Sequence, residues 1–231
     1  MEEKPVFDRD VIYHLRDINQ ELVTEWTECF KAYPTTVKPS HGDICVGAPA
    51  ADAIVCPGNS FGFMGKGAMD SAIINYFGQD IQDNLQEVIR DEYEGELLVG
   101  QAVILGGLDR TERNMAHNWS NMNQGDPITY LITAPTVRVP QNVSTTPNAY
   151  LAFRAVILAV RKHNLDHKTS PIRQVLVPGL VSGGGRMPVK RCAMQMLEAY
   201  ETHVQTKYPS RLNPTSLSEM SADHVKMCSA V

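Results

Sequence analysis

The chain has 231 residues, of which 43% are hydrophobic and 20% charged, and its net charge is −5. These values are those of an ordinary folded domain and argue against global disorder. The excess of acidic residues also argues against nucleic acid as a partner, because a protein surface that binds nucleic acid needs a basic patch. Backbone N–H groups can still bind a small anion.

Apolar patterns predict strands and helices that alternate along the chain. We expect strands over 11–15, 53–56, 102–105, 129–134 and 174–177. We expect helices from 19 to before Pro34 and over 68–77, 81–93, 148–163 and 188–207. The helices are indicated by apolar residues at helical spacing, with stops at Pro34 and Gly78.

The expected strands are short and apolar on both faces, which is typical of a buried, mainly parallel sheet. The alternation therefore predicts a single α/β domain over residues 1–208. The polar stretch 109–126 is predicted to be a long loop or a loop with a broken helix. Residues 209–231 are polar and contain Pro209 and Pro214, so we expect a flexible C-terminal tail.

The five cysteines are odd in number and form no CxxC pair, which argues against a disulfide framework and a cysteine zinc site. The first ten residues lack the apolar stretch of a signal peptide, and no apolar run approaches the roughly 20 residues of a membrane span. We therefore expect no metal, no cofactor and no membrane partner. We expect a cytoplasmic protein with possible access to the nucleus.

Two expected strands end in glycine-rich loops that lead into helices, Asn59–Asp70 and Gly179–Arg186. Ligands of open α/β sheets bind beyond the carboxyl ends of the strands. Glycines let backbone N–H groups approach an anion, and a following helix N-terminus favours negative charge. Neither loop is a P-loop or a dinucleotide-binding GxGxxG turn. Two such loops suit a diphosphate, although plain tight turns remain an alternative.

Several ordered segments resemble a macrodomain. Residues 42–44 read GDI, residues 52–60 read DAIVCPGNS, and residues 65–73 read GKGAMDSAI. The stretch 178–188, framed by two prolines, resembles the second glycine loop of that family, and 133–135 resembles the strand end before it. The resemblance implies a three-layer α/β/α sandwich with a mainly parallel, mixed central sheet that binds ADP-ribose.

The resemblance also implies a set of ligand-binding residues. Asp43 would accept a hydrogen bond from the adenine amino group, and Asn59 would face the distal ribose. The first glycine loop would lie along that ribose and the diphosphate, and the second would wrap the diphosphate. The candidates are Asp43, Ile44, Asn59, Ser60, Gly65, Lys66, Gly67, Ala68, Met69, Ser182, Gly183, Gly184, Gly185 and Arg186.

Macrodomains include both hydrolases and non-catalytic readers, so the resemblance implies ADP-ribose or an ADP-ribosylated protein as the partner. A hydrolase would cleave an ADP-ribosyl linkage or ADP-ribose 1″-phosphate. The candidate catalytic residues are Asn59, which would hold ribose hydroxyls, and Asp70, which would position or activate water. A reader of ADP-ribosylated partners is the alternative.

The sequence departs from the family pattern around the distal ribose. The usual Asn-Ala-Ala-Asn run reads Cys56-Pro57-Gly58-Asn59, and Lys66 and Ala68 interrupt the first glycine run. Plainer roles remain open for the polar candidates: Asp43 as a turn aspartate, Asn59 as a turn cap and Asp70 as a charge at a helix N-terminus.

Overall fold

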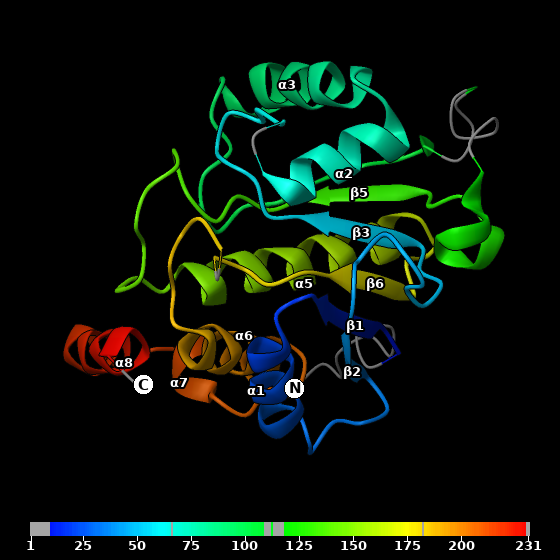
Figure 1. Ribbon diagram of the computed structural model, residues 1–231. Helices are drawn as coiled ribbons and strands as arrows, with labels where there is room; N and C mark the ends of the chain where they lie inside the picture. Colours follow the sequence, from blue (N-terminus) through cyan, green and yellow to red (C-terminus); the bar gives the residue numbers. More distant parts are fainter. Residues whose placement is uncertain (1–9, 66, 109–111, 113–117, 182, 230–231) are drawn as a thin grey trace.

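The computed structural model describes residues 10–65, 67–108, 112, 118–181 and 183–229. Its centre is a six-stranded sheet with the order β2-β1-β6-β3-β5-β4 (Figure 1). Every neighbouring pair is parallel except β4 and β5, which are antiparallel. The strands are β1 (Ile12–Asp17), β2 (Val37–His41), β3 (Ala53–Cys56), β4 (Val103–Leu105), β5 (Tyr130–Thr133) and β6 (Gln174–Val177).

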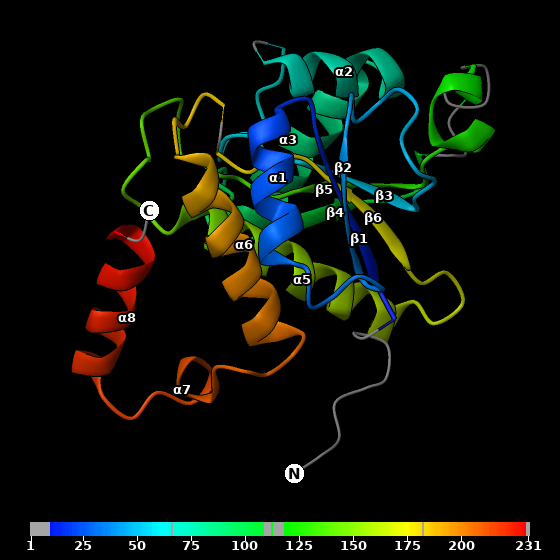
Figure 2. The same cartoon turned by 60° about the horizontal axis from the view of Figure 1, so that its bottom comes forward.

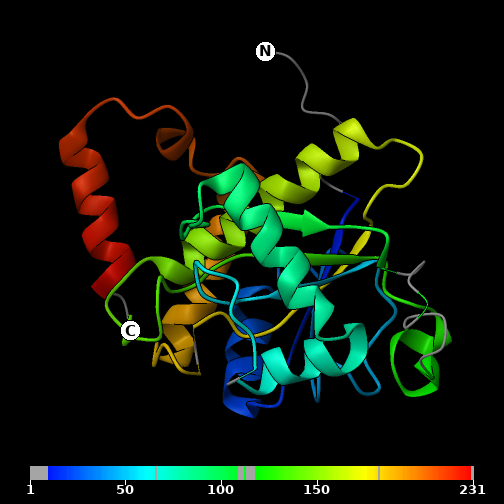
Figure 3. The ribbon, with the colours of Figure 1, turned by 90° about the horizontal axis from the view of Figure 1, so that it is seen from above.

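Helices cover both faces of the sheet. One face carries α1 (Gln20–Cys29), α5 (Asn148–Asp166) and α6 (Val189–His203). The other carries α2 (Ala68–Phe77) and α3 (Asp80–Tyr93), which lie in front of the sheet in Figure 3. The fold is therefore the expected three-layer α/β/α sandwich with a mainly parallel, mixed sheet.

The two faces have separate apolar cores. Trp26 of α1 and Phe153 of α5 are fully buried against one face, together with Tyr13 of β1. Ile73 and Phe77 of α2 are buried against the other face. Alternate residues of a strand point to opposite faces, so the central strand β3, which is buried on both faces, is apolar throughout.

The strongest sequence patterns give the right bounds. The expected ranges 53–56, 68–77 and 174–177 match β3, α2 and β6 residue for residue. Strand β2 was not expected, because its sequence contains Pro39 and only Val37 is buried. Proline lacks an N–H group, but an edge strand that pairs only with β1 tolerates this loss.

The sheet order brings the candidate loops together. Strands β1, β6 and β3 are adjacent and parallel, so their carboxyl ends lie at one edge of the sheet. The coil after β6, yellow in Figure 2, lies beside the green coil that follows β5. A hydrogen bond of 2.9 Å from the Val143 N–H to the Gly185 carbonyl joins the two coils.

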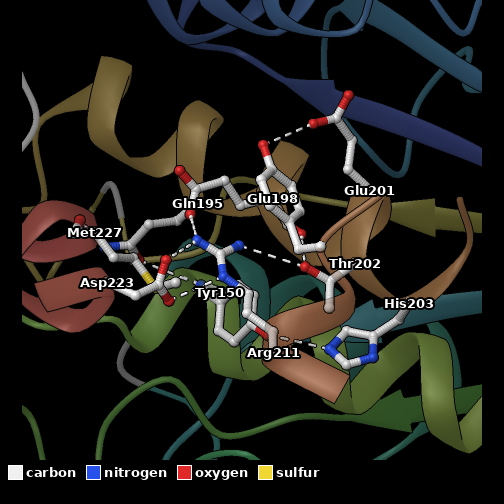
Figure 4. Close-up of polar contacts among 10 residues, drawn as sticks. Tyr150, Gln195, Glu198, Glu201, Thr202, His203, Arg211, Asp223 and Met227 are labelled. Atoms are coloured by element: carbon white, nitrogen blue, oxygen red, sulfur yellow. Dashed lines mark hydrogen bonds and ion pairs between the residues drawn. The ribbon is translucent and has the colours of Figure 1, made fainter. Parts of the chain in front are cut away.

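The segment after Tyr208, for which the sequence predicts a polar, flexible tail, contains two helices in the structure. It forms α7 (Pro209–Leu212) and α8 (Leu217–Ser229). The Arg211 guanidinium lies 2.7 Å from Glu198 of α6 and 2.6 Å from Asp223 of α8 (Figure 4). These ion pairs join residues that are distant in the sequence, so composition alone did not indicate them. Pro209 starts a helix here, since a missing N–H is harmless in a first turn.

Part of the polar stretch 109–126 lies outside the described residues. The rest contains two short 3-10 helices, η3 (Trp119–Asn121) and η4 (Asn123–Gly125), and Trp119 is buried near Phe77 of α2. In the described part of the chain, no helix is long and apolar enough to cross a membrane.

Candidate functional site

A cavity of about 930 Å³ opens at the carboxyl ends of the parallel strands. Its lining residues fall within the segments 16–19, 42–44, 57–59, 67–72, 136–142, 178–181 and 183–186. The volume is at the upper end of the range for small-molecule sites, and the position is the one at which open α/β sheets bind ligands. The geometry therefore indicates a site for a ligand of nucleotide size.

Most of the residues expected from the sequence meet at this cavity. The following line it: Asp43, Ile44, Asn59, Gly67, Met69, Asp70, Gly183, Gly184, Gly185 and Arg186. Ser60 and Gly65 are not among the lining residues, and the buried Ser60 Oγ has no hydrogen-bond partner among the described residues. Lys66 and Ser182 lie outside the described residues, and Ala68 is the first residue of α2.

The Asn59 side chain is engaged by its own loop. Its Oδ1 accepts hydrogen bonds from the N–H groups of Phe61 at 3.1 Å and Phe63 at 3.3 Å. Its Nδ2 donates to the Phe63 carbonyl at 2.7 Å. The turn-cap role that the sequence left open is therefore present in the structure, and Asn59 lines the cavity as well.

Asp70 combines a structural and a chemical role. It occupies the third position of α2, where the backbone of the N-cap residue Gly67 favours the ionised carboxylate. The Cys56 thiol lies 3.8 Å from Oδ1. Burial raises the pKa of the Asp70 carboxyl above its ordinary value, although both donors act in the opposite direction. Asp70 is thus a half-buried carboxyl on the cavity wall with enhanced basicity.

Asp43 lies in the turn that follows β2. Its Oδ1 accepts a hydrogen bond of 2.7 Å from the Cys45 N–H, and its side chain is otherwise exposed on the cavity wall. The backbone carbonyl of Asp43 accepts a hydrogen bond of 2.7 Å from Arg16 Nε. The second carboxylate oxygen therefore stays available to a donor on a ligand.

The second glycine loop is tight at one end and open at the other. An added Cβ at Gly185 would lie 2.9 Å from Val181, whereas Gly183 and Gly184 have no neighbouring atom within 4 Å of that position. Val181 and Arg186 have φ values of +61° and +57°, which side-chain-bearing residues adopt at a cost. Open glycines beside a cation make a suitable cradle for phosphate oxygens.

Sequence reasoning missed several cavity residues, among them Arg16, Asp17, Thr136 and Asn142. None belongs to a recognised motif. Asp17 joins the end of β1 to the second loop, because its Oδ2 accepts a hydrogen bond of 3.0 Å from the Gly179 N–H. The only available signal was position, since Asp17 ends a strand of the parallel sheet.

The described residues contain no group of three or more His, Cys, Asp or Glu side chains that could hold a metal ion. His163 and His167 stack with their ring centroids 4.4 Å apart, and His163 Nε2 contacts the Ser170 carbonyl. Both lie at the C-terminal end of α5, which leads into the amino end of β6, and neither lines the cavity at the carboxyl ends of the strands.

Comparisons with known proteins agree with this geometry. The profile of the family described as Macro-like domain matches residues 16–211, which leaves out α8. A mutant of the Oceanobacillus iheyensis macrodomain solved with ADP-ribose is 18% identical, with a TM-score of 0.50 and coverage of 67% of this chain and 72% of that chain. The same macrodomain solved with ADP is 19% identical, with a TM-score of 0.50 and coverage of 68% and 71%.

A third structure, the macrodomain of Mycobacterium tuberculosis DarG, is 19% identical, with a TM-score of 0.50. The match covers 71% of this chain and 90% of that one. At these identities the solved structures establish the fold.

Proposed function

The chain belongs to the macro-like domain family, and we propose that its cavity binds ADP-ribose or a derivative of it. The observation that carries this proposal is the meeting of two glycine-rich loops and Asp43 at one cavity of nucleotide size. The Oceanobacillus iheyensis macrodomain, which shares the fold, was solved with ADP-ribose and with ADP.

The proposed orientation follows from the chemistry of the walls. The carboxylate oxygen of Asp43 that Cys45 does not engage accepts a hydrogen bond from the adenine amino group, and Ile44 lies beside the ring. The N-terminus of α2 and the open glycines 183–184 receive the diphosphate, and Arg186 adds a positive charge. Asn59 and Asp70 then lie at the distal ribose.

We further propose that the chain hydrolyses an ADP-ribosyl linkage or ADP-ribose 1″-phosphate. The support is Asp70, a half-buried carboxyl on the cavity wall whose pKa burial raises toward the range of a general base. Asp70 would take a proton from the water that attacks the anomeric carbon of the distal ribose. The bond from that carbon to the linked group would break, and the group, phosphate in the case of ADP-ribose 1″-phosphate, would leave with the bonding electron pair. The diphosphate and the Asn59 amide would hold the ribose in place.

A non-catalytic reader of ADP-ribosylated proteins is the second candidate. The observation that favours it is the engagement of both polar ends of the Asn59 amide by backbone groups of its own loop. A reader needs the cavity but no free amide at the ribose.

The five cysteines are all free, which fits a reducing compartment such as the cytoplasm or the nucleus.

Calorimetry with ADP-ribose tests binding, and an absence of binding would overturn the proposed function. Assays on a mono-ADP-ribosylated protein and on ADP-ribose 1″-phosphate then separate the two candidates. We expect Asn59→Ala and Asp70→Ala to remove turnover and to leave ADP-ribose binding largely intact. Turnover that survives in both variants contradicts the assigned roles, and binding without turnover in the unsubstituted chain identifies a reader.

A further inference from the structure

Arg16, at the carboxyl end of β1, is hydrogen-bonded to the loop that carries Asp43. Its Nε donates to the Asp43 carbonyl at 2.7 Å. Its Nη1 donates to Ser40 Oγ and to the His41 carbonyl, both at 3.2 Å, and its Nη2 donates to the Val46 carbonyl at 3.2 Å. One guanidinium thus bonds the end of β2 at two points and the loop that follows it at two more, between residues 40 and 46.

Gly42 allows this contact. An added Cβ at Gly42 would lie 2.3 Å from Nη2 of Arg16 and 2.8 Å from its Cζ, and its φ of +142° already disfavours a side chain. The Gly42 N–H also donates to the Asp17 carbonyl at 3.0 Å, so the loop is fixed to β1 at two neighbouring residues. The guanidinium therefore packs directly on the backbone of the loop.

The acceptors of Arg16 are neutral. None of its hydrogen bonds within the described part of the chain reaches a carboxylate, and the Asp43 carboxylate bonds to the Cys45 N–H instead. An arginine that bonds three carbonyls and a hydroxyl fixes a backbone by the geometry of its planar fork rather than by charge. Arg16 and the loop residues Gly42, Asp43 and Ile44 line the same wall of the cavity.

We propose that Arg16 is a positioning residue that holds Asp43 where its carboxylate distinguishes adenine from other bases. The inference rests on the proposed function, because it assigns the reading of the base to this wall. Lysine keeps the charge of Arg16 but has a single nitrogen that cannot reach all four acceptors. We therefore expect Arg16 to affect the choice of base rather than the diphosphate contacts, because none of its hydrogen bonds in the described part of the chain reaches a glycine loop.

The test compares ADP-ribose with its hypoxanthine analogue, in which a carbonyl replaces the amino group of the ring, by calorimetry. We expect the unsubstituted chain to prefer ADP-ribose about tenfold or more, as one hydrogen bond to a charged group allows. In Arg16→Lys this preference falls to about twofold or less. Gly42→Ala places a methyl group where the Arg16 guanidinium lies, so we expect it to displace the guanidinium and to reduce the preference for ADP-ribose by the same amount. Arg173→Lys, an exposed arginine at the opposite end of β6, is the matched control and keeps the preference.

A double substitution completes the test. In an Asp43→Ala background, Arg16→Lys is expected to change the affinity for ADP-ribose less than twofold, because the group that Arg16 positions is gone. Three outcomes overturn the inference: both variants keep the preference, the two ligands weaken equally, or ADP-ribose binds without any preference over the analogue. Failure of the unsubstituted chain to bind either ligand instead overturns the proposed function. Thermal melting of each variant checks that it is folded.

Discussion

Arg211 connects three helices, and its removal should loosen the C-terminal helix. Its Nε and Nη2 form a two-point contact with the Asp223 carboxylate at 2.9 and 2.6 Å. Nη2 also contacts Glu198 at 2.7 Å, and the guanidinium lies 4.4 Å from the centre of the Tyr208 ring. The Arg211 side chain is only 7% exposed, so its removal leaves two carboxylates without their cation in a half-buried site.

We therefore expect Arg211→Met to lower the free energy of unfolding. Loss of one partner of a buried ion pair costs about 3–5 kcal/mol. Asp223 is 27% exposed, so water screens part of this cost and about 2–3 kcal/mol remains. For a chain of this length each kcal/mol lowers Tm by about 2–4 °C, which gives a decrease of about 4–12 °C.

The matched control is Arg90→Met. Arg90 forms ion pairs with Glu87 and Asp91, but its side chain is 66% exposed, so we expect a loss of about 0–1 kcal/mol. Scanning calorimetry measures both Tm values, and hydrogen exchange reports whether the amides of α8 open first. An equal Tm for the two variants, together with unchanged exchange in α8, would refute the view that Arg211 holds this helix.

Three further predictions concern the cavity and the sheet. Gly185→Ala should cost about 1–3 kcal/mol by overpacking, whereas Gly184→Ala, which meets open space, should leave Tm unchanged; equal Tm values would contradict this. Asp70→Asn should stabilise the chain at pH 7, because the raised pKa penalises the ionised carboxyl only in the folded state. This gain should vanish below pH 3.8, and a gain that grows on acidification would contradict it. Asp52→Ala should cost about 1.5–3 kcal/mol by urea unfolding, since its carboxylate accepts two backbone N–H groups at the start of β6; a loss under 0.5 kcal/mol would contradict it.

The sequence predicted best the strands that are buried on both faces of the sheet. Residues 53–56 and 175–177 are buried in a parallel sheet, so both runs are apolar, and each is followed by a Pro-Gly pair. Strand β2 and the last two helices were missed for the opposite reason. Their stability depends on a single edge pairing with β1 and on ion pairs made by Arg211, and neither leaves a local periodic pattern.

The candidate site divides in the same way. Its glycine loops have a local signature, because only glycine permits a close approach of the backbone, and most of their described residues line the cavity. Arg16 and Asp17 have no such signature. Their roles depend on hydrogen bonds to residues 27 and 162 positions away, which the fold alone brings together.

The contacts of Asn59 set a condition on any catalytic role. To reach a ribose hydroxyl, its amide would release up to three hydrogen bonds to Phe61 and Phe63, each worth about 0.5–1.5 kcal/mol. The ligand would have to supply about 1.5–4.5 kcal/mol in return, or the loop would have to move with the amide. Asp70 meets no such condition, because its side chain lines the cavity and its only hydrogen bond to another side chain in the described residues is the long contact of 3.8 Å from the Cys56 thiol. A hydrolase built on this chain would therefore use Asp70 for proton transfer as it stands, whereas Asn59 would hold the ribose only after the ligand replaces these hydrogen bonds.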